Sequence, residues 1–197
     1  MKNKLFAVLM AVLFMTSCSI VDVLNHYEDG LSLTDEEFYE LVQGKWIINK
    51  VGYWTTLDEY GVEQIDQDND YPVPVSAMKS LEIDRTTIKF NFTHQVPVTY
   101  TWWDTEAETR REKTVLHDSF VSKYSRPGSK SELNFGLEAD GTEYFWCHHN
   151  SELEDGYSGY MIIDLYGIEK MNGDVIVKRM IIRSGDYGCY EFVKSEK

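Results

Sequence analysis

The stretch Leu41-Val42-Gln43-Gly44-Lys45-Trp46-Ile47-Ile48 decides the fold, because a helical pattern stops at its glycine and an extended run begins at its tryptophan. The residues before it predict a short helix. Thr34 with Glu37 makes a capping box at the start, and Gly44 suits the position just after the end. From Trp46 to Thr56 the chain is rich in aromatic and β-branched residues, which favour a strand. The stretch therefore predicts a helix that leads directly into the first strand of a sheet.

The rest of the chain predicts strands separated by turns, with no second helix. The β-rich runs are Leu81–Ile83, Thr87–Phe92, Val96–Trp103, Thr114–Ser122, Glu132–Leu137, Thr142–His148, Tyr160–Ile168, Val175–Arg183 and Tyr187–Val193. Turn residues separate them at Arg126–Ser129, Ala139–Gly141, Asn172–Gly173 and Ser184–Asp186. The Asn-Gly pair is the strongest signal, because both central positions of a type I′ hairpin turn need positive φ.

This spacing predicts an all-β fold, either a barrel or a sandwich. Short connections between consecutive strands favour an antiparallel up-and-down β-barrel, and closing the barrel would remove exposed strand edges. Because the chain has no internal repeat and no linker, we expect residues 32–197 to form one domain. Residues 1–17 and 18–31 would precede it as a leader and a tether.

The leader has the composition of a secretory signal peptide. Lys2 and Lys4 make a positive start, and the eleven apolar residues 5–15 are too few for a membrane-spanning helix of about 20 residues. The run ends in Met15-Thr16-Ser17-Cys18, which resembles the lipoprotein box of bacteria. The resemblance implies cleavage before Cys18, lipid attachment at Cys18 and an anchor in the outer membrane, on its periplasmic or its surface face.

Charge narrows the range of partners. Removing residues 1–17 and their two lysines from the 197-residue chain leaves 17 of its 19 basic side chains and all 33 acidic ones, a formal charge of −16. A chain this acidic repels phosphate backbones, so we expect no nucleic-acid partner. Two further cysteines, Cys147 and Cys189, are either free buried thiols or a disulfide between neighbouring strands.

A short helix, then Gly44-Lys45-Trp46 at the first strand, then a β-meander is similar to the lipocalins and the lipocalin-like lipoproteins of Gram-negative bacteria. The resemblance implies that Gly44 lets the entering chain pass close and that Trp46 packs across the closed end of the barrel. It also implies an arginine stacked on Trp46, for which Arg179 and Arg183 are the candidates. The implied activity is non-covalent binding of a small, apolar molecule in the barrel, without a cofactor.

Strand alternation assigns faces to the first strand. If Trp46 points inward, so do Ile48, Lys50, Gly52 and Trp54, unless a bulge reverses the far half. The candidates to line a ligand cavity are aromatic or charged residues of predicted strands: Lys50, Trp54, Tyr100, Trp102, Trp146, Tyr160, Asp164 and Arg183.

Two of these candidates carry further constraints. Trp102 and its neighbour Trp103 must face opposite ways, so one of them lies outside any cavity. Asp164 follows a run of apolar residues, and a buried acid there needs a partner. Lys50 or Arg183 would provide it, either in a site that orients a ligand or in a structural ion pair.

Three other segments contain residue types found in metal sites or catalytic triads, but their spacing does not suit such a site. Asp66–Asp70, in the long connection Leu57–Ala77, spaces carboxylates like a calcium loop but lacks the turn glycine and the final acid. Strand alternation separates the side chains of Cys147-His148-His149 and of His117-Asp118-Ser119, so we expect neither a metal site nor a triad. The sequence predicts no metal, no cofactor and no enzymatic activity. The connection itself reads as a solvated loop or as a lid over a cavity.

Two functions remain open beside the small-ligand carrier. One is a β-sandwich or filled-barrel module that binds a glycan or a protein through surface Trp and Tyr side chains. The other is a filled barrel with a structural role in the cell envelope. A packed interior with coplanar aromatic side chains on the outside would favour the binding module, whereas a cavity that opens beside Trp54 under the Leu57–Ala77 connection would favour the carrier.

Overall fold

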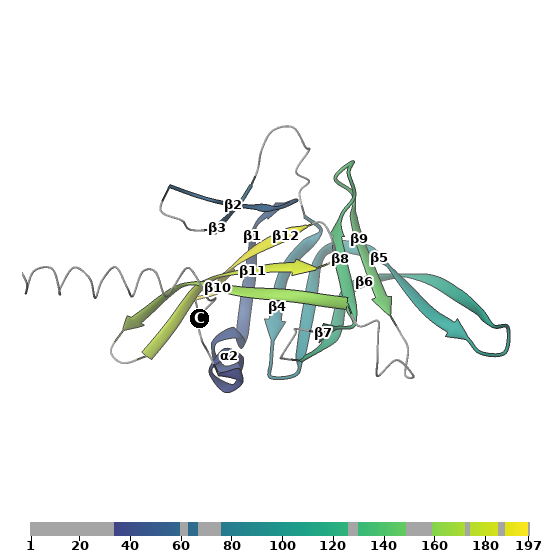
Figure 1. Ribbon diagram of the computed structural model, residues 1–197, viewed down its shortest axis with the longest axis horizontal. Coiled ribbons are helices and arrows are strands. Elements are labelled where there is room, and N and C mark those ends of the chain that lie inside the picture. The colour runs from purple at the N-terminus through teal and green to yellow at the C-terminus, as the bar shows by residue number, and fades with distance from the viewer. Residues whose placement is uncertain are drawn as a thin grey trace, which may run out of the picture.

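The computed structural model describes residues 34–59, 63–66, 76–125, 130–148, 159–171, 174–184 and 188–196. Most of these residues lie in β-strands, and the one helix among them, α2 (Asp35–Val42), packs at one end of the sheet (Figure 1). The expected all-β fold with a short helix before the first strand is confirmed. The expected signal peptide, the tether and the lipidation site Cys18 lie outside the described residues.

Helix α2 begins as the sequence predicts. The hydroxyl of Thr34 accepts a hydrogen bond from the backbone N–H of Glu37, and the Glu37 carboxylate accepts one from the backbone N–H of Thr34 at 2.9 Å. This reciprocal pair is the capping box. Phe38 and Val42 are buried in the core. Just beyond the helix, Gly44 has φ +118°, a conformation that residues with a side chain rarely adopt.

Trp46 fixes the junction between α2 and strand β1 (Gly44–Gly52). Its ring is fully buried, and its indole N–H donates to the carbonyl of Val42 at 2.7 Å. The ammonium group of Lys194 lies 5.1 Å from the centroid of the Trp46 ring and donates to the carbonyl of Leu41 at 2.9 Å. These two bonds satisfy carbonyl groups that a helix C-terminus leaves without partners.

A bulge reverses the faces of β1 halfway along the strand. β1 pairs antiparallel with β12 (Cys189–Lys194), where Ile48 is opposite Phe192 but Lys50 is opposite Glu191, which leaves Asn49 as an extra residue. The next residue, Val51, therefore joins the core.

Strict alternation thus holds up to Ile48, and beyond it the structure confirms the alternative that a bulge reverses the far half. Lys50 and Gly52 lie on the outer side of the sheet, whereas Tyr53 is buried in the core. Trp54, expected inside, is 41% exposed.

Ten strands form one strongly curled mixed sheet, a half-barrel (Figure 1). Across the sheet their order is β4 (Met78–Ile83), β1, β12, β11 (Asp174–Ser184), β10 (Gly159–Met171), β7 (Lys130–Ser131), β6 (Thr109–Ser125), β5 (Thr87–Asp104), β9 (Glu143–His148) and β8 (Leu133–Leu137). β4 also pairs with β5. The expected purely antiparallel, up-and-down order is wrong at β9, which runs parallel to β5.

β5 and β6 are much longer than the sequence predicts. The expected strands Thr87–Phe92 and Val96–Trp103 are parts of one strand with an irregularity between Asn91 and Val96. A tight turn at residues 105–108 then joins β5 to β6. Asp104 starts this turn, because its carboxylate accepts hydrogen bonds from the backbone N–H groups of Glu106 and Ala107. Residues 96–117 are here called the ribbon. β9 pairs with its base at Thr99–Thr101, and its two-stranded end projects from the sheet (Figure 1).

The β8–β9 hairpin covers the concave side of the sheet. Leu133, Phe135 and Leu137 of β8 are at most 1% exposed. The ring of Phe135 lies edge-on to Tyr190 at 4.9 Å and to Phe90 at 5.5 Å between centroids. This side of the sheet is therefore packed with side chains from β5, β8 and β12.

Polar contacts fasten the same hairpin to its neighbours. At the start of β9, Glu143 accepts hydrogen bonds from the hydroxyl of Ser76 at 2.6 Å and from the backbone N–H of Ala77 at 2.5 Å. The backbone N–H of Phe135 donates to the hydroxyl of Ser184 at 3.2 Å.

A second, small sheet lies in the connection between β1 and β4. It consists of β2 (Thr55–Leu57) and β3 (Glu63–Ile65). Ile65 packs against Ile181 and Cys189 on the outer side of the main sheet. The connection Leu57–Ala77, expected as a loop or a lid over a cavity, thus includes a strand packed on the convex side. Of the calcium candidate Asp66–Asp70, only Asp66 lies within the described residues.

We predict that Trp46→Ala lowers the free energy of unfolding by about 3–5 kcal/mol, as large core truncations do. The substitution removes the buried ring, its hydrogen bond to the carbonyl of Val42 and its contact with the Lys194 ammonium group. Chemical denaturation measures the change. Trp103→Ala is the matched control, because Trp103 is 54% exposed and its removal should cost less than about 1 kcal/mol. Equal losses for the two variants would contradict the role of Trp46 as the core junction.

Candidate functional site

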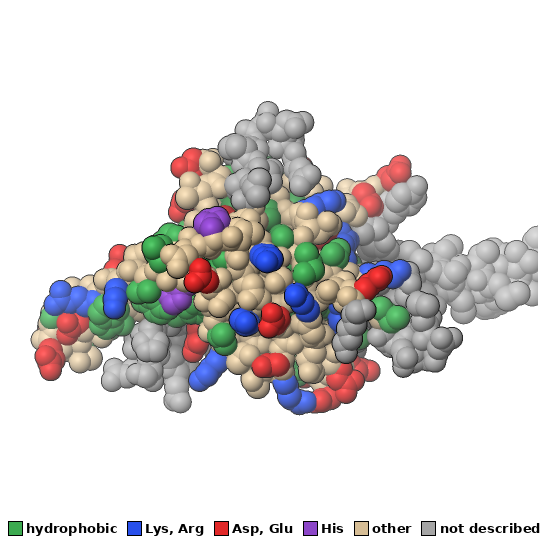
Figure 2. All heavy atoms as spheres, turned by 180° about the vertical axis from the view of Figure 1, so that it is seen from behind, with side chains coloured by type: hydrophobic (Ala, Val, Ile, Leu, Met, Phe, Trp, Pro, Cys, Tyr) green, Lys and Arg blue, Asp and Glu red, His purple; other side chains and the backbone are tan. Residues whose placement is uncertain are grey.

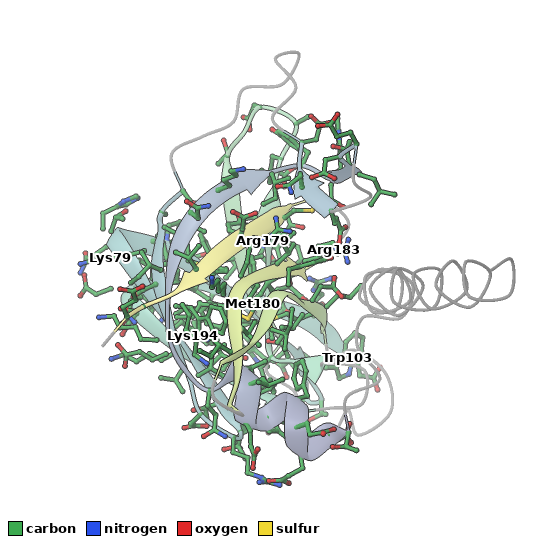
Figure 3. All side chains as sticks on the ribbon, turned by 90° about the vertical axis from the view of Figure 1, so that its left-hand side faces the viewer. Lys79, Trp103, Arg179, Met180, Arg183 and Lys194 are labelled. Carbon is green, nitrogen blue, oxygen red and sulfur yellow. The ribbon has the colours of Figure 1, made fainter. Side chains whose placement is uncertain are left out.

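An ion cluster lies between the β2–β3 hairpin and the outer side of β10, β11 and β12. Its members are five charged side chains: Glu63, Asp164, Arg179, Arg183 and Glu191. Strand pairing brings them together, because Asp164 of β10 and Glu191 of β12 are both opposite Ile181 of β11. Arg179 and Arg183 lie on the side of β11 toward the hairpin, while Met180 points to the core (Figure 3).

Glu63 is the centre of this cluster. Its carboxylate forms an ion pair with the Arg183 guanidinium at 2.5 Å and accepts hydrogen bonds from the hydroxyl groups of Thr55 and Tyr166. Arg183 also forms an ion pair with Asp164. One of the two partners expected for Asp164 is therefore confirmed, and the pair lies on the convex side of the sheet.

Arg179 connects the hairpin to β12. It donates to the Glu191 carboxylate at 2.8 Å and to the backbone carbonyl of Glu63 at 2.8 Å, and it lies 4.7 Å from the ring centroid of Tyr166. Glu191 is 2% exposed and also accepts from the side-chain amide of Asn49 at 2.5 Å. A buried carboxylate needs such partners, because burial without them is costly.

The two carboxyl groups that share Arg183 have pKa values shifted in opposite directions. Burial alone would raise the pKa of Glu63, but hydrogen bonds from Thr55 and Tyr166 and the charge of Arg183 hold it below 4.5. Burial is the largest effect on Asp164, so its pKa is raised despite Arg183. Glu63 is therefore the carboxylate that holds the hairpin at neutral pH. All these contacts are between groups of the protein, so we interpret the ion cluster as structural.

We predict that Glu63→Gln lowers the free energy of unfolding at pH 7 by about 1–3 kcal/mol, because the Glu63–Arg183 pair is partly buried and lies between exposed and fully buried ion pairs. Because the folded-state pKa is lowered, the stability from Glu63 is present above the unfolded-state value of 4.5 and is lost as pH falls below it. The difference between wild type and variant should therefore shrink between pH 7 and pH 3.

Denaturant titrations at both pH values measure this difference. Glu82→Gln is the control, because Glu82 pairs with Lys89 at 3.8 Å on the surface and should contribute less than about 1 kcal/mol. A Glu63→Gln loss that does not change with pH would contradict the assigned role.

We predict that Gly52→Ala displaces the β2–β3 hairpin. A Cβ atom at position 52 would lie 2.4 Å from Ile65 Cγ2 and 2.6 Å from the backbone carbonyl oxygen of Asp66, so β3 must move. The expected cost is about 1–3 kcal/mol. Labelling with a thiol reagent measures the displacement, because Cys189 lies under Ile65 and should become reactive. Cys147 is the internal control, and equal reactivity of the two thiols would indicate global unfolding instead.

The residues expected to line a cavity do not converge. Lys50, Asp164 and Arg183 lie on the outer side of the sheet, and the indole N–H of Trp54 donates to Asp66 at 2.9 Å. Trp146 lies on the outer side of β9, and only Tyr100 and Trp102 share the inner face of the ribbon. The side chain of Tyr160 lies outside the described residues.

A second group of residues, here called the tryptophan face, lies on the outer side of β6, β5 and β9. Trp103 of β5 is opposite Arg110 of β6, and Trp146 of β9 is opposite Thr99 of β5, so all four point to the same side. Trp103 is 54% exposed and Trp146 is 37% exposed. The Arg110 guanidinium lies 5.5 Å from the ring centroid of Trp146. Trp103 is well apart from Arg179 and Arg183 of the ion cluster (Figure 3).

The inner face of the ribbon has its own aromatic group. The Tyr100 hydroxyl and the His117 ring nitrogen Nε2 are 2.9 Å apart, and Phe120 lies within 6.2 Å of both rings. Burial raises the pKa of Tyr100. Asp118 points the other way, toward Gln95. His117-Asp118-Ser119 therefore does not converge as a catalytic triad.

Three positions that matter for the structure or for the tryptophan face were not identified from the sequence. The cation on Trp46 is Lys194, whereas the expected Arg179 and Arg183 belong to the ion cluster. Lys194 falls just after the last expected strand, which ended at Val193. Extending the alternation of that strand by one residue would have placed Lys194 on the face of Phe192. Arg110 and Glu63 lie on elements that the pattern does not predict, so no local signal marks them.

Both cysteines are free and buried on opposite sides of the sheet. Burial raises the pKa of Cys147 and of Cys189 to about 11, so both are thiols at neutral pH. Within the described ranges, no group of three His, Cys, Asp or Glu side chains is placed to hold a metal ion. The described part of the chain also has no helix long and apolar enough to span a membrane.

Comparison of the chain with protein-family models, with curated proteins and with solved structures finds no match.

Proposed function

We propose that this chain is a membrane-anchored binding module that holds its partner on the tryptophan face. A lipid on Cys18 would anchor it in the outer membrane, and the curled sheet would be a lipocalin-like barrel with a filled interior. The observation that carries the proposal is the exposure of Trp103 and Trp146 beside Arg110. Tryptophan and arginine are enriched among the residues that dominate binding energy at recognition surfaces.

The position of the tryptophan face supports the same proposal. The ribbon projects from the sheet, so a large partner can approach it without a clash with the half-barrel (Figure 1). Seen from behind, the projecting arm carries hydrophobic side chains along its length and charged ones at its end (Figure 2). Exposed apolar side chains that gather on one face, as Trp103 and Trp146 do, are more typical of a contact site than singly scattered ones.

A carrier of small apolar molecules has less support. Such a carrier needs a cavity of about 300–1,000 Å³ lined by apolar groups. On the concave side, Leu133, Phe135 and Leu137 of β8 fill the space against β5 and β12. Tyr100 and Trp102 on the inner face of the ribbon are the two expected lining residues that favour a carrier.

Oxidative footprinting tests the proposal. Hydroxyl radicals oxidise exposed aromatic side chains, and mass spectrometry compares the full chain in intact cells with the purified chain in detergent. We expect oxidation of Trp103 and Trp146 to fall severalfold in cells, because the partner covers both rings. Trp54 is the control, since it is 41% exposed away from the tryptophan face and should be oxidised equally in both samples.

Two results would contradict the binding module. One is equal oxidation of Trp103 and Trp146 in cells and in detergent. The other is protection restricted to Tyr100 and Trp102, which would favour a small ligand on the inner face.

A further inference from the structure

The tryptophan face is a platform with two rings at its ends. Trp146 is level with Thr99, four residues before Trp103 along β5, so the two positions are about 13 Å apart at about 3.3 Å per residue. Thr101 lies between them and is 5% exposed. The two rings and the Arg110 side chain share one face, and together they span more than the width of a single sugar ring.

Hydrogen-bonding groups of both kinds flank this surface. Arg110 forms an ion pair with Glu112 at 3.4 Å, and both side chains are more than half exposed. Arg110 offers donors and Glu112 offers acceptors beside the rings. The hydroxyl groups of Thr99 and Thr114, 3.1 Å apart, add groups that both donate and accept. This mixture suits a ligand whose own groups donate and accept at once, as sugar hydroxyl groups do.

Charge argues against an anionic occupant. The Arg110–Glu112 pair leaves the centre of the face electrically balanced. At the tip of the ribbon Arg111 pairs with Asp104 at 3.1 Å, and Glu106 and Glu108 add two further acidic side chains to a chain of formal net charge −14. Anionic polymers and anionic lipid surfaces are repelled by such a field. A neutral occupant meets no such repulsion.

We infer that the tryptophan face binds a neutral polysaccharide, with sugar rings stacked on Trp103 and Trp146 and hydroxyl groups bonded to Arg110 and Glu112. This inference rests on the proposed binding module and names its partner class. The aliphatic C–H faces of pyranose rings pack on indole rings, while the ring substituents point sideways to polar groups. Two rings carried by backbone positions about 13 Å apart along β5 favour a chain of several sugars over a monosaccharide.

Affinity electrophoresis tests this inference. The full chain, purified in detergent, is run through nondenaturing gels that contain starch, xylan, mixed-linkage β-glucan or galactomannan, and through a gel that contains anionic polygalacturonate. We expect at least one neutral polysaccharide to retard the protein more than polygalacturonate does. Trp103→Ala and Trp146→Ala should each raise the dissociation constant about tenfold or more, as the loss of a binding hot spot does. Trp103→Phe keeps a stacking ring and should keep part of the retardation.

Trp54→Ala is the matched control and should bind within about twofold of wild type, since Trp54 is similarly exposed but lies off the face. Thermal unfolding of each variant separates lost binding from lost folding. Lack of retardation in every neutral gel, stronger retardation by polygalacturonate, or retardation that both tryptophan variants retain would each overturn the inference. If Trp103 and Trp146 are nevertheless protected in the footprint, the binding module stands with a partner of another class. If they are not protected, both proposals fail.

Discussion

The packing of Phe135 against Tyr190 and Phe90 is the interaction on which the rest of the structure depends. A curled sheet must cover its concave side with apolar groups, and β8 provides them. To bring β8 there, β5 pairs with β4 along its first half and with β9 along its second. The parallel direction of β9 and the free length of the ribbon both follow from this exchange of neighbours. Because β8 fills the concave side, the residues expected to line a cavity lie elsewhere. Lys50, Asp164 and Arg183 are on the convex side, and Tyr100 and Trp102 are on the ribbon.

The bulge at Asn49 organises the convex side. It turns Val51 inward and Gly52 outward, and an outward glycine lets β3 approach within van der Waals contact. Ile65 of β3 then buries Ile181 and Cys189 in a second, smaller core. Around this core the ion cluster satisfies the buried Glu191 carboxylate. One extra residue in β1 thus connects the main sheet, the hairpin and five charged side chains.

Local chemistry made part of this structure predictable. The capping box of Thr34 and Glu37 follows from residue type and spacing. The burial of Trp46 was expected from the resemblance to lipocalins, and Arg183 was one of two partners expected for Asp164. The turn at residues 105–108 was missed because it contains no Gly, Pro or Asn, and its one signal is Asp104 before it.

Long-range pairing made the rest unpredictable. No periodicity within Glu143–His148 reveals that this strand runs parallel to β5, because the choice depends on which distant strand has a free edge. The same holds for the tryptophan face. Trp103 and Trp146 are 43 residues apart in the chain, and strand alternation alone assigns neither to a common side. For β1 the sequence left two alternatives open, strict alternation or a bulge, because the residues on both faces of the strand are fairly apolar.

The placement of the two cysteines affects the kinetic stability of the protein. Cys147 and Cys189 are separated by the thickness of the sheet, each in its own core, so a disulfide between them cannot form in the folded chain. An unfolded chain has no such barrier, and an oxidant could then join the two sulfur atoms and prevent the sheet from forming again. Under oxidising conditions, unfolding thus becomes a one-way loss. The lifetime of the protein would be set by the rate at which it unfolds, and not by the equilibrium between the folded and unfolded states.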